Sequence, residues 1–284
     1  MSRILSGEKI ARQILSNLQK KKPRRKLSLA VLQVGENVVS ARYVGEKRKV
    51  AKELRVGFRY IRLPADISQV KLEREIERVG KDKEISGMIV QLPLPRQLNT
   101  QRALDLIPKR KDVDVLSSVS FSDFALGILS ILPPTVAAIS LLLKESKRKL
   151  EGANVVVVGA GRLVGLPTAL WLAQEGAALS LIQKDTRNAS QLISKADIVI
   201  SGVGKPKLIT GKMIKKGAVV IDAGTSVGEH VRHSVSNTLK TSKIEGDVEF
   251  ESVVKKAGYL APVPGGVGPL TVACLFKNLF LLNG

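Results

Sequence analysis

A tyrosine and a lysine stand four residues apart in the stretch SARYVGEKRKVAKEL, residues 40–54. On a helix this spacing places Tyr43 and Lys47 on one face, one turn apart. A phenol beside an ammonium group could handle protons, and burial would lower the lysine pKa until the amine works as a base near neutrality. Taken alone, however, the motif favours a plainer interpretation, a surface lysine on a basic helix.

A glycine-rich segment offers a second kind of chemistry. VVVVGAGRLVGLP, residues 155–167, places Gly159, Gly161 and Gly165 between a strand pattern and a helix pattern. Glycines permit a tight turn and a close backbone approach, so the free N–H groups of the helix could face a pyrophosphate. The spacing G-x-G-x-x-x-G departs from the standard fingerprint, but the strand–turn–helix context is the required one. The alternative is a purely structural turn.

The end of the next strand bears on which dinucleotide would bind. The segment QKDTRN, residues 183–188, carries Lys184, Asp185 and Arg187. A basic residue at this place would accept a ribose 2′-phosphate, and an acidic residue would hold a 2′-hydroxyl. Two positive charges against one negative favour NADP, while Asp185 leaves NAD as the alternative.

The elements that would position these residues follow an alternating pattern. Strand-like runs alternate with helical runs, which predicts an α/β protein with βαβ units and parallel sheets. The pattern occurs twice, on either side of a polar stretch and a connecting helix at 135–150. We therefore predict two domains, an N-terminal α/β domain at 1–135 and a Rossmann-type dinucleotide-binding domain at 136–267. The C-terminal helix, within 268–284, could return to the first domain.

Composition narrows the class of protein. The 284 residues include 46 Lys and Arg against 25 Asp and Glu, a net charge of +21. Such charge indicates either a polyanionic partner or solvated basic helix faces. No nucleic-acid motif accompanies it, so we do not expect nucleic-acid binding as the main function. No apolar run approaches the roughly 20 residues of a membrane span, and we expect no membrane partner.

Cysteine and histidine usage points to a reducing compartment without a metal site. The one cysteine, Cys274, lies in an apolar run, where a buried small side chain is expected. His230 and His233 stand among polar residues without a further Cys/His cluster, so we expect no metal. The basic, amphipathic N-terminus could be a mitochondrial presequence, but its helical stripe favours the first helix of a cytoplasmic protein.

Several further motifs occur in order along the chain: YVGEKRK (43–49), VQLPLP (90–95), KDVD (111–114), the glycine-rich turn, and PVPGGVGPLTVA (262–273). Together they closely resemble the bifunctional methylenetetrahydrofolate dehydrogenase/cyclohydrolase family, over nearly the whole chain. Members oxidise 5,10-methylenetetrahydrofolate to the 5,10-methenyl cation with a nicotinamide cofactor, and hydrolyse that cation to 10-formyltetrahydrofolate.

The resemblance implies a role for each matching residue. Lys47 would be the cyclohydrolase general acid/base, Tyr43 would orient the folate, Gln91 would hydrogen-bond and tune Lys47, and Asp114 would hold the pterin. The remaining implied substrate-binding residues are Leu92, Pro93, Pro264, Gly265 and Gly266. The implied cofactor-binding residues are Thr135, Gly159, Gly161, Arg162, Val164, Gly165, Lys184, Thr225, Gly268 and Thr271.

The resemblance also implies partners. Cofactor and folate would meet in a cleft between the domains, and the chain would form a homodimer through its cofactor domain. The basic surface would suit the polyglutamate tail of cellular folates.

The chain departs from the family pattern mainly on the cofactor side. ENVVS (36–40) replaces a small Pro-Ala before the serine, and Val115 stands where the family has glycine. Pro133–Val136 read PPTV instead of PCTP, Gly161 replaces a serine, and Thr225-Ser226 replace Ile-Asn. Three alternatives follow: a member retaining one of the two activities, another two-domain NAD(P)-dependent dehydrogenase, or a basic nucleic-acid-binding protein on a dinucleotide-fold scaffold.

Overall fold

The structure is a computed structural model that describes residues 2–21, 23, 25–234 and 237–284, without the side chains of 38, 39 and 227–243. The chain forms two compact units. We call Ala11–Pro134 with Thr271–Gly284 the three-stranded unit, and Met1–Ile10 with Thr135–Leu270 the six-stranded unit. The predicted boundaries had placed the first ten residues in the other unit. Their assignment follows from β1 (Arg3–Ile4), which pairs with β11 (Tyr259–Ala261).

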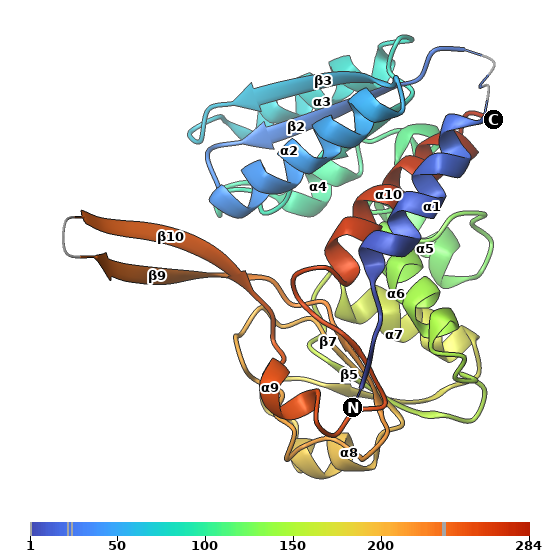
Figure 1. The fold of residues 1–284 in the computed structure, drawn as a ribbon. Helices are drawn as coiled ribbons and strands as arrows, with labels where there is room; N and C mark the ends of the chain where they lie inside the picture. Colours follow the sequence, from blue (N-terminus) through green and yellow to red (C-terminus); the bar gives the residue numbers. More distant parts are fainter. Residues whose placement is uncertain (1, 22, 24, 235–236) are drawn as a thin grey trace. The chain divides into compact units, whose positions relative to one another are not determined.

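The three-stranded unit contains a parallel sheet in the order β3-β2-β4. Its strands are β2 (Ser28–Val34), β3 (Gly57–Leu63) and β4 (Gly87–Val90). Helix α2 (Val38–Glu53) connects β2 to β3, and α3 (Gln69–Lys81) connects β3 to β4. Two of the predicted βαβ units are therefore present (Figure 1).

Side-chain caps mark where the two connecting helices begin. The Asn37 side chain accepts a hydrogen bond from the Ser40 N–H at the start of α2, and Ser68 does the same for Lys71 at the start of α3. Such caps satisfy backbone donors that have no partner inside the helix. The shorter helices of this unit are α4 (Thr100–Leu104), the 3₁₀ turn η1 (Lys109–Lys111) and α5 (Ser118–Ala125), and α1 (Gly7–Gln19) enters it from the other unit.

The C-terminal helix α10 (Val267–Leu281) joins the three-stranded unit from Thr271 onward, as predicted. The Asn278 side chain donates to the backbone oxygens of Val113 (3.0 Å) and Leu132 (2.8 Å). A Cβ added at Gly87 of β4 would lie 2.6 Å from Leu279 Cδ1, so the helix packs directly on the strand. The apolar core of the unit includes a buried cluster between this sheet and helices α3 and α4.

The six-stranded unit contains a parallel sheet in the order β1-β11-β8-β7-β5-β6. The central strands β5 (Asn154–Val158), β7 (Ile198–Ser201) and β8 (Val219–Asp222) are buried apart from Asn154, and β6 (Ala178–Ile182) forms one edge. Both faces of such a sheet are covered, which explains the continuous Val and Ile runs. The helices are α6 (Pro134–Glu145), α7 (Gly165–Gln174), α8 (Ala189–Lys195) and α9 (Phe250–Val253). This architecture confirms the predicted fold class.

An antiparallel ribbon was not predicted. Strands β9 (Ser226–Ser234) and β10 (Asn237–Glu245) pair from Ser226↔Glu245 to Ser234↔Asn237 and extend away from the six-stranded sheet (Figure 1). The side chains of His230 and His233 lie outside the described residues. Among the described residues, no three or more His, Cys, Asp or Glu side chains form a metal-binding group.

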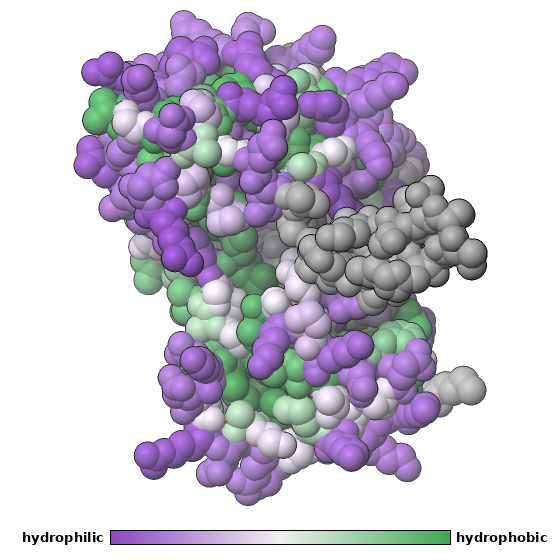
Figure 2. All heavy atoms as spheres, turned by 90° about the vertical axis from the view of Figure 1, so that its left-hand side faces the viewer, coloured by the Kyte–Doolittle hydropathy of each residue, from purple (hydrophilic) through white to green (hydrophobic). Residues whose placement is uncertain are grey.

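The described part of the chain contains no helix long and apolar enough to cross a membrane. Hydrophilic side chains cover most of the face of the three-stranded unit seen at the top of Figure 2, in keeping with the net charge of +21.

Candidate active site

Lys47 lies on the buried face of α2, with 7 % of its surface exposed. Its Nζ donates a hydrogen bond to Gln91 Oε1 at 2.8 Å. Tyr43 is half-buried one helical turn earlier. The interpretation of Lys47 as an ordinary surface lysine is therefore wrong, because the amine is turned inward and held by a specific acceptor.

Gln91 is positioned by the sheet. It directly follows β4, and its backbone N–H donates to Leu32 O at 2.8 Å, which continues the ladder between β4 and β2. Its side-chain Nε2 donates to Leu92 O at 3.1 Å, so the amide oxygen is left facing Lys47. Ser40 Oγ donates to the same Leu92 oxygen at 3.2 Å and ties the first turn of α2 to this segment.

Asp114 supplies a negative charge that acts on the pKa of Lys47. Removal from water lowers the pKa of Lys47, while the negative charge of Asp114 acts in the opposite direction. Burial raises the pKa of Asp114, an effect that Lys47 reduces and Asp112 increases. The environment therefore brings both groups closer to their neutral forms than either would be in water. A lysine with a lowered pKa can exchange protons near neutral pH.

The loop that carries Asp114 is held by its neighbour Asp112. The buried Asp112 carboxylate accepts hydrogen bonds from Leu116 N (3.1 Å), Ser117 N (2.9 Å) and Ser117 Oγ (2.7 Å). A bridge between Asp112 and Met88 attaches the same loop to β4. Val115 adopts φ +58°, a left-handed conformation that favours glycine.

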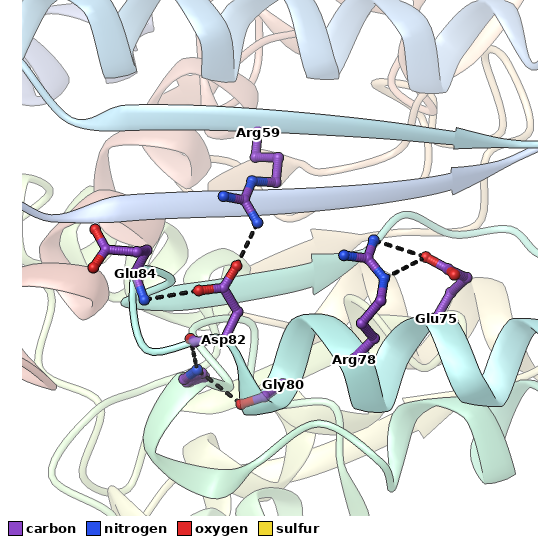
Figure 3. Close-up of polar contacts among 7 residues, drawn as sticks. Arg59, Glu75, Arg78, Gly80, Asp82 and Glu84 are labelled. Carbon is purple, nitrogen blue, oxygen red and sulfur yellow. Dashed lines mark hydrogen bonds and ion pairs between the residues drawn. The ribbon is translucent and has the colours of Figure 1, made fainter.

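The preceding residue anchors this loop to the end of α3. Lys111 Nζ donates to the backbone oxygens of Gly80 (2.8 Å) and Asp82 (2.6 Å). Figure 3 shows the surroundings: the Asp82 carboxylate lies between the Arg59 guanidinium of β3 and the Glu84 N–H. Lys111 and Asp112, which both precede Asp114, therefore hold the loop that carries it.

The glycine-rich turn of the six-stranded unit requires glycine at two positions. Gly159 has φ +94°, and a Cβ at Gly165 would lie 1.7 Å from Gly159 O, so a side chain at either position would disrupt the turn. The N-cap residue of α7, Val164, makes no side-chain cap hydrogen bond. Within the first turn of α7, the Leu166 N–H donates to Gly161 O (3.1 Å), the Thr168 N–H donates to Val164 O (3.0 Å), and Pro167 has no N–H. The predicted strand–turn–helix is present.

The other residues of the predicted site fall into the two units separately. Leu92 and Pro93 follow Gln91 in the three-stranded unit, and Thr271 of α10 also belongs to that unit. The six-stranded unit holds the rest: Thr135 in the first turn of α6, Arg162 in the glycine-rich turn, Lys184 exposed after β6, Thr225 beside β9, and Pro264, Gly265, Gly266 and Gly268 around the start of α10.

Sequence reasoning assigned no role to three buried carboxylates. Asp112 holds the Asp114 loop, while Asp222 and Asp247 bind backbone N–H groups at the carboxyl edge of the six-stranded sheet. A sequence signal was present for two of them, because Asp222 ends an apolar strand run before Ala-Gly and Asp247 follows Gly246. Aspartates beside glycine at a strand end commonly bind nearby backbone N–H groups.

Comparison with known proteins gives a consistent result over the whole chain. Residues 5–114 match the model of the tetrahydrofolate dehydrogenase/cyclohydrolase catalytic domain, and residues 133–283 match that family's NAD(P)-binding domain. The bifunctional protein FolD of Moorella thermoacetica is 39 % identical over 282 residues, covering 98 % of this chain and 97 % of that protein.

Two solved structures are similar throughout. The bifunctional FolD enzyme of Campylobacter jejuni has a TM-score of 0.89 and 33 % identity, covering 100 % of this chain and 99 % of that one. The Trypanosoma brucei enzyme, complexed with NADP and an inhibitor, has a TM-score of 0.91 and 32 % identity, with 99 % and 97 % covered. The motifs, both units and these similarities lead to one conclusion: the chain belongs to the tetrahydrofolate dehydrogenase/cyclohydrolase family.

Proposed function

We propose that this chain oxidises 5,10-methylenetetrahydrofolate to the 5,10-methenyl cation with NADP and hydrolyses the cation to 10-formyltetrahydrofolate. The observation that carries the proposal is the buried Lys47 amine, hydrogen-bonded to Gln91 and electrostatically coupled to Asp114. A dehydrogenase alone would have no use for this lysine, because hydride transfer requires placement of two rings and no added acid or base.

Lys47 carries the proton transfers of hydrolysis. As water adds to the methenyl carbon, the Lys47 amine accepts one of its protons. Lys47 then returns this proton to N5 of the folate as the carbon–N5 bond breaks, and the remaining hydroxyl proton leaves to solvent. A cationic substrate disfavours a second positive charge nearby, so it further favours the neutral amine. Gln91 Oε1 keeps the amine in place.

The other residues bind and orient the substrates. Tyr43 stacks on the folate, and Asp114 holds the polar edge of the pterin. Leu92, Pro93 and Pro264–Gly266 contribute further folate contacts. NADP, when bound, accepts the hydride. Gly159, Gly161, Arg162, Val164 and Gly165 would hold its pyrophosphate, and the remaining proposed cofactor contacts are Thr135, Lys184, Thr225, Gly268 and Thr271.

A turnover assay with separate readouts tests both activities. Purified protein is given methylenetetrahydrofolate with NADP or NAD, and reduced cofactor and methenyl product are followed separately. Methenyltetrahydrofolate alone tests hydrolysis directly. Turnover in both assays is the expected result. Hydrolysis without cofactor reduction would restrict the function to the cyclohydrolase, and activity in neither would refute the proposal.

The preference for NADP rests on Lys184, which is exposed in the loop after β6. An exposed cation here can pair with a 2′-phosphate, and NAD lacks this group. We therefore expect Lys184→Ala to weaken NADP binding several-fold more than NAD binding. The measurement is the dissociation constant of each cofactor by titration calorimetry, with Lys195→Ala on α8 as a matched control. Equal losses for NADP and NAD would contradict the role of Lys184.

We further propose a cytoplasmic homodimer formed through the six-stranded unit. The family resemblance supports the dimer, and the single, buried Cys274 is compatible with a reducing compartment. Sedimentation velocity at micromolar concentration tests the dimer, which a single monomeric species would contradict.

A further inference from the structure

The strand order of the six-stranded sheet defines where a ligand can bind. The chain runs from β5 to its neighbour β6 and then crosses to β7 on the other side of β5. In open α/β sheets the loops separate at such a switch point, and ligands bind there at the carboxyl ends of the strands. Two loops flank this point: the glycine-rich turn after β5 and residues 202–205 after β7.

The two loops are in direct contact. A Cβ added at Gly159 would lie 3.0 Å from Val203 Cγ2 and 3.1 Å from Gly202 O. A Cβ added at Gly202 would lie 2.4 Å from Val164 Cγ1. Because these contacts leave no space for a side chain, a shift of the 202–205 loop toward the glycine-rich turn would displace that turn.

A single buried carboxylate holds the 202–205 loop. Asp247, 1 % exposed, accepts hydrogen bonds at Oδ2 from Ser201 Oγ (2.7 Å) and Val203 N (2.7 Å), and at Oδ1 from Lys205 N (2.8 Å). Both oxygens are engaged with residues of this loop or the end of β7. Charge-assisted hydrogen bonds of this kind are stronger than neutral ones, so Asp247 restrains the loop at both Val203 and Lys205.

Asp247 is itself held by a second carboxylate, Asp222. Asp222 Oδ1 accepts from Asp247 N (3.0 Å) and Gly224 N (3.1 Å), and Oδ2 accepts from Val248 N (2.9 Å). Burial raises the pKa of Asp222 to about 6, so at pH 7 to 8 the group is largely ionised and accepts these bonds as a carboxylate.

Glycine is required on both sides of the carboxylate pair. A Cβ at Gly224 would lie 2.1 Å from Asp247 Cγ, and one at Gly246 would lie 1.9 Å from Asp222 Oδ2. These close approaches allow each aspartate to be enclosed by backbone N–H donors.

We propose that Asp247, supported by Asp222, is a positioning residue that sets one wall of the NAD(P) crevice through the loop at 202–205. This inference rests on the proposed function of the six-stranded unit as the cofactor-binding part. A restraint on the crevice wall acts on cofactor affinity, whereas methenyl hydrolysis uses Lys47 and Gln91 in the other unit.

The test compares Asp247→Asn, Asp222→Asn and Ser201→Ala with the control Asp197→Asn. An Asn in place of either aspartate replaces one carboxylate oxygen, an acceptor, with an NH₂ group that would face a backbone N–H. Ser201→Ala removes one of the three hydrogen bonds that Asp247 accepts. Asp197 also accepts a backbone N–H and a lysine, from Asn154 and Lys215, but it precedes β7 at the amino edge of the same sheet. The control therefore removes a hydrogen-bonded but less buried carboxylate away from the crevice.

Two readouts decide the outcome. The dissociation constant for NADP should rise about tenfold or more in Asp247→Asn and less in Ser201→Ala, and should stay within about twofold in Asp197→Asn. Hydrogen exchange of the Val203 and Lys205 amides, measured without cofactor, should accelerate in the same order. Methenyl hydrolysis reports general damage to the fold. In each variant at the crevice, the loss in NADP affinity should exceed any loss in the rate of this hydrolysis.

Unchanged NADP affinity in folded Asp247→Asn would overturn the inference, as would an equal loss in Asp197→Asn. If Asp247→Asn does not fold, the same criteria apply to Ser201→Ala and Asp222→Asn. A wild-type protein that does not bind NADP would refute the dehydrogenase assignment itself. A wild type that binds NADP, with variants that bind equally well, would refute only the positioning role.

Discussion

Two opposing effects act on the pKa of the Lys47 side chain. Its burial favours the neutral amine, and the nearby Asp114 favours the charged one. Gln91 Oε1 accepts a hydrogen bond in either state, so the amine can lose and regain a proton without losing its position. This balance is what a group needs if it is to act first as a base and then as an acid.

Replacing Lys47 with Met keeps the apolar stem and removes the amine. We expect Lys47→Met to reduce methenyl hydrolysis by at least about a hundredfold, because general acid–base groups contribute roughly 10²–10⁴ in rate. Folate binding should persist. Stopped-flow measurement of methenyl loss gives the rate, and Lys49→Met, an exposed lysine on the same helix, is the matched control. Hydrolysis retained in Lys47→Met would remove this residue from the mechanism.

The pH dependence of hydrolysis reports the Lys47–Asp114 pair. Because the neutral amine is the base, the rate should rise with pH through the lowered pKa of Lys47 and level off below the ordinary lysine range. Asp114 opposes that lowering, so Asp114→Asn should move the inflection to lower pH. The pH–rate profile of single-turnover hydrolysis in both proteins measures the shift. An inflection that stays in place or moves upward would contradict the electrostatic coupling.

At the scale of elements, the loop between η1 and α5 shows how a local conformation is imposed. Val115 is fully buried with φ +58°, although a β-branched side chain disfavours the left-handed region. Asp112 accepts the N–H groups of Leu116 and Ser117 and thereby maintains the turn. The contacts around Val115 thus offset a backbone conformation that its own side chain opposes.

A pair of substitutions isolates this backbone cost. Both Val115→Ala and Val115→Gly should destabilise the fold, because both remove a buried side chain. Val115→Gly should nevertheless be more stable than Val115→Ala by about 1 kcal/mol, because the left-handed conformation costs a non-glycine residue about 1–2 kcal/mol. Denaturant unfolding measures the difference. The buried Val113, whose φ is not positive, is the control. There we expect Val113→Ala to be more stable than Val113→Gly. If alanine is also the more stable replacement at Val115, the backbone strain is disproved.

At the scale of the whole molecule, the net charge of +21 has a direct use if the substrate is polyanionic. Each γ-linked glutamate of a folate tail adds a carboxylate, and an excess of exposed lysine and arginine attracts it over distances up to the Debye length. The hydrophilic face of the three-stranded unit in Figure 2 is compatible with such attraction.

Salt should therefore distinguish folates by tail length. Between about 0.05 M and about 0.5 M salt the Debye length falls from roughly 14 Å to roughly 4 Å. Across this range we expect the KM of a pentaglutamate substrate to rise several-fold more than that of the monoglutamate, with kcat nearly unchanged. Steady-state kinetics with both substrates measures this difference. Equal salt dependence for both tails would show that the surface charge does not contribute to substrate binding.

Local pattern was sufficient for much of the architecture. Alternating apolar and helical runs predicted both parallel sheets, because the sequence of a strand or helix reflects which of its faces is buried. The spacing of Tyr43 and Lys47 predicted their shared helix face for the same reason. The glycine-rich turn could be recognised because the backbone itself requires glycine at Gly159 and Gly165.

Other features depend on residues far apart in the chain, and local pattern carries little signal for them. The two-residue strand β1 pairs with β11, some 250 residues later, and so places the N-terminus in the six-stranded unit. The β9–β10 ribbon was likewise not predicted. Asp247 holds Ser201 across 46 positions, and Lys47 meets Gln91 across 44.

The sequence by itself therefore determined most of the elements, the family and the residue types of the site. Only the tertiary structure decided which polar groups are buried together, because burial and the pKa shifts that it causes arise from packing between elements that the chain order does not place side by side.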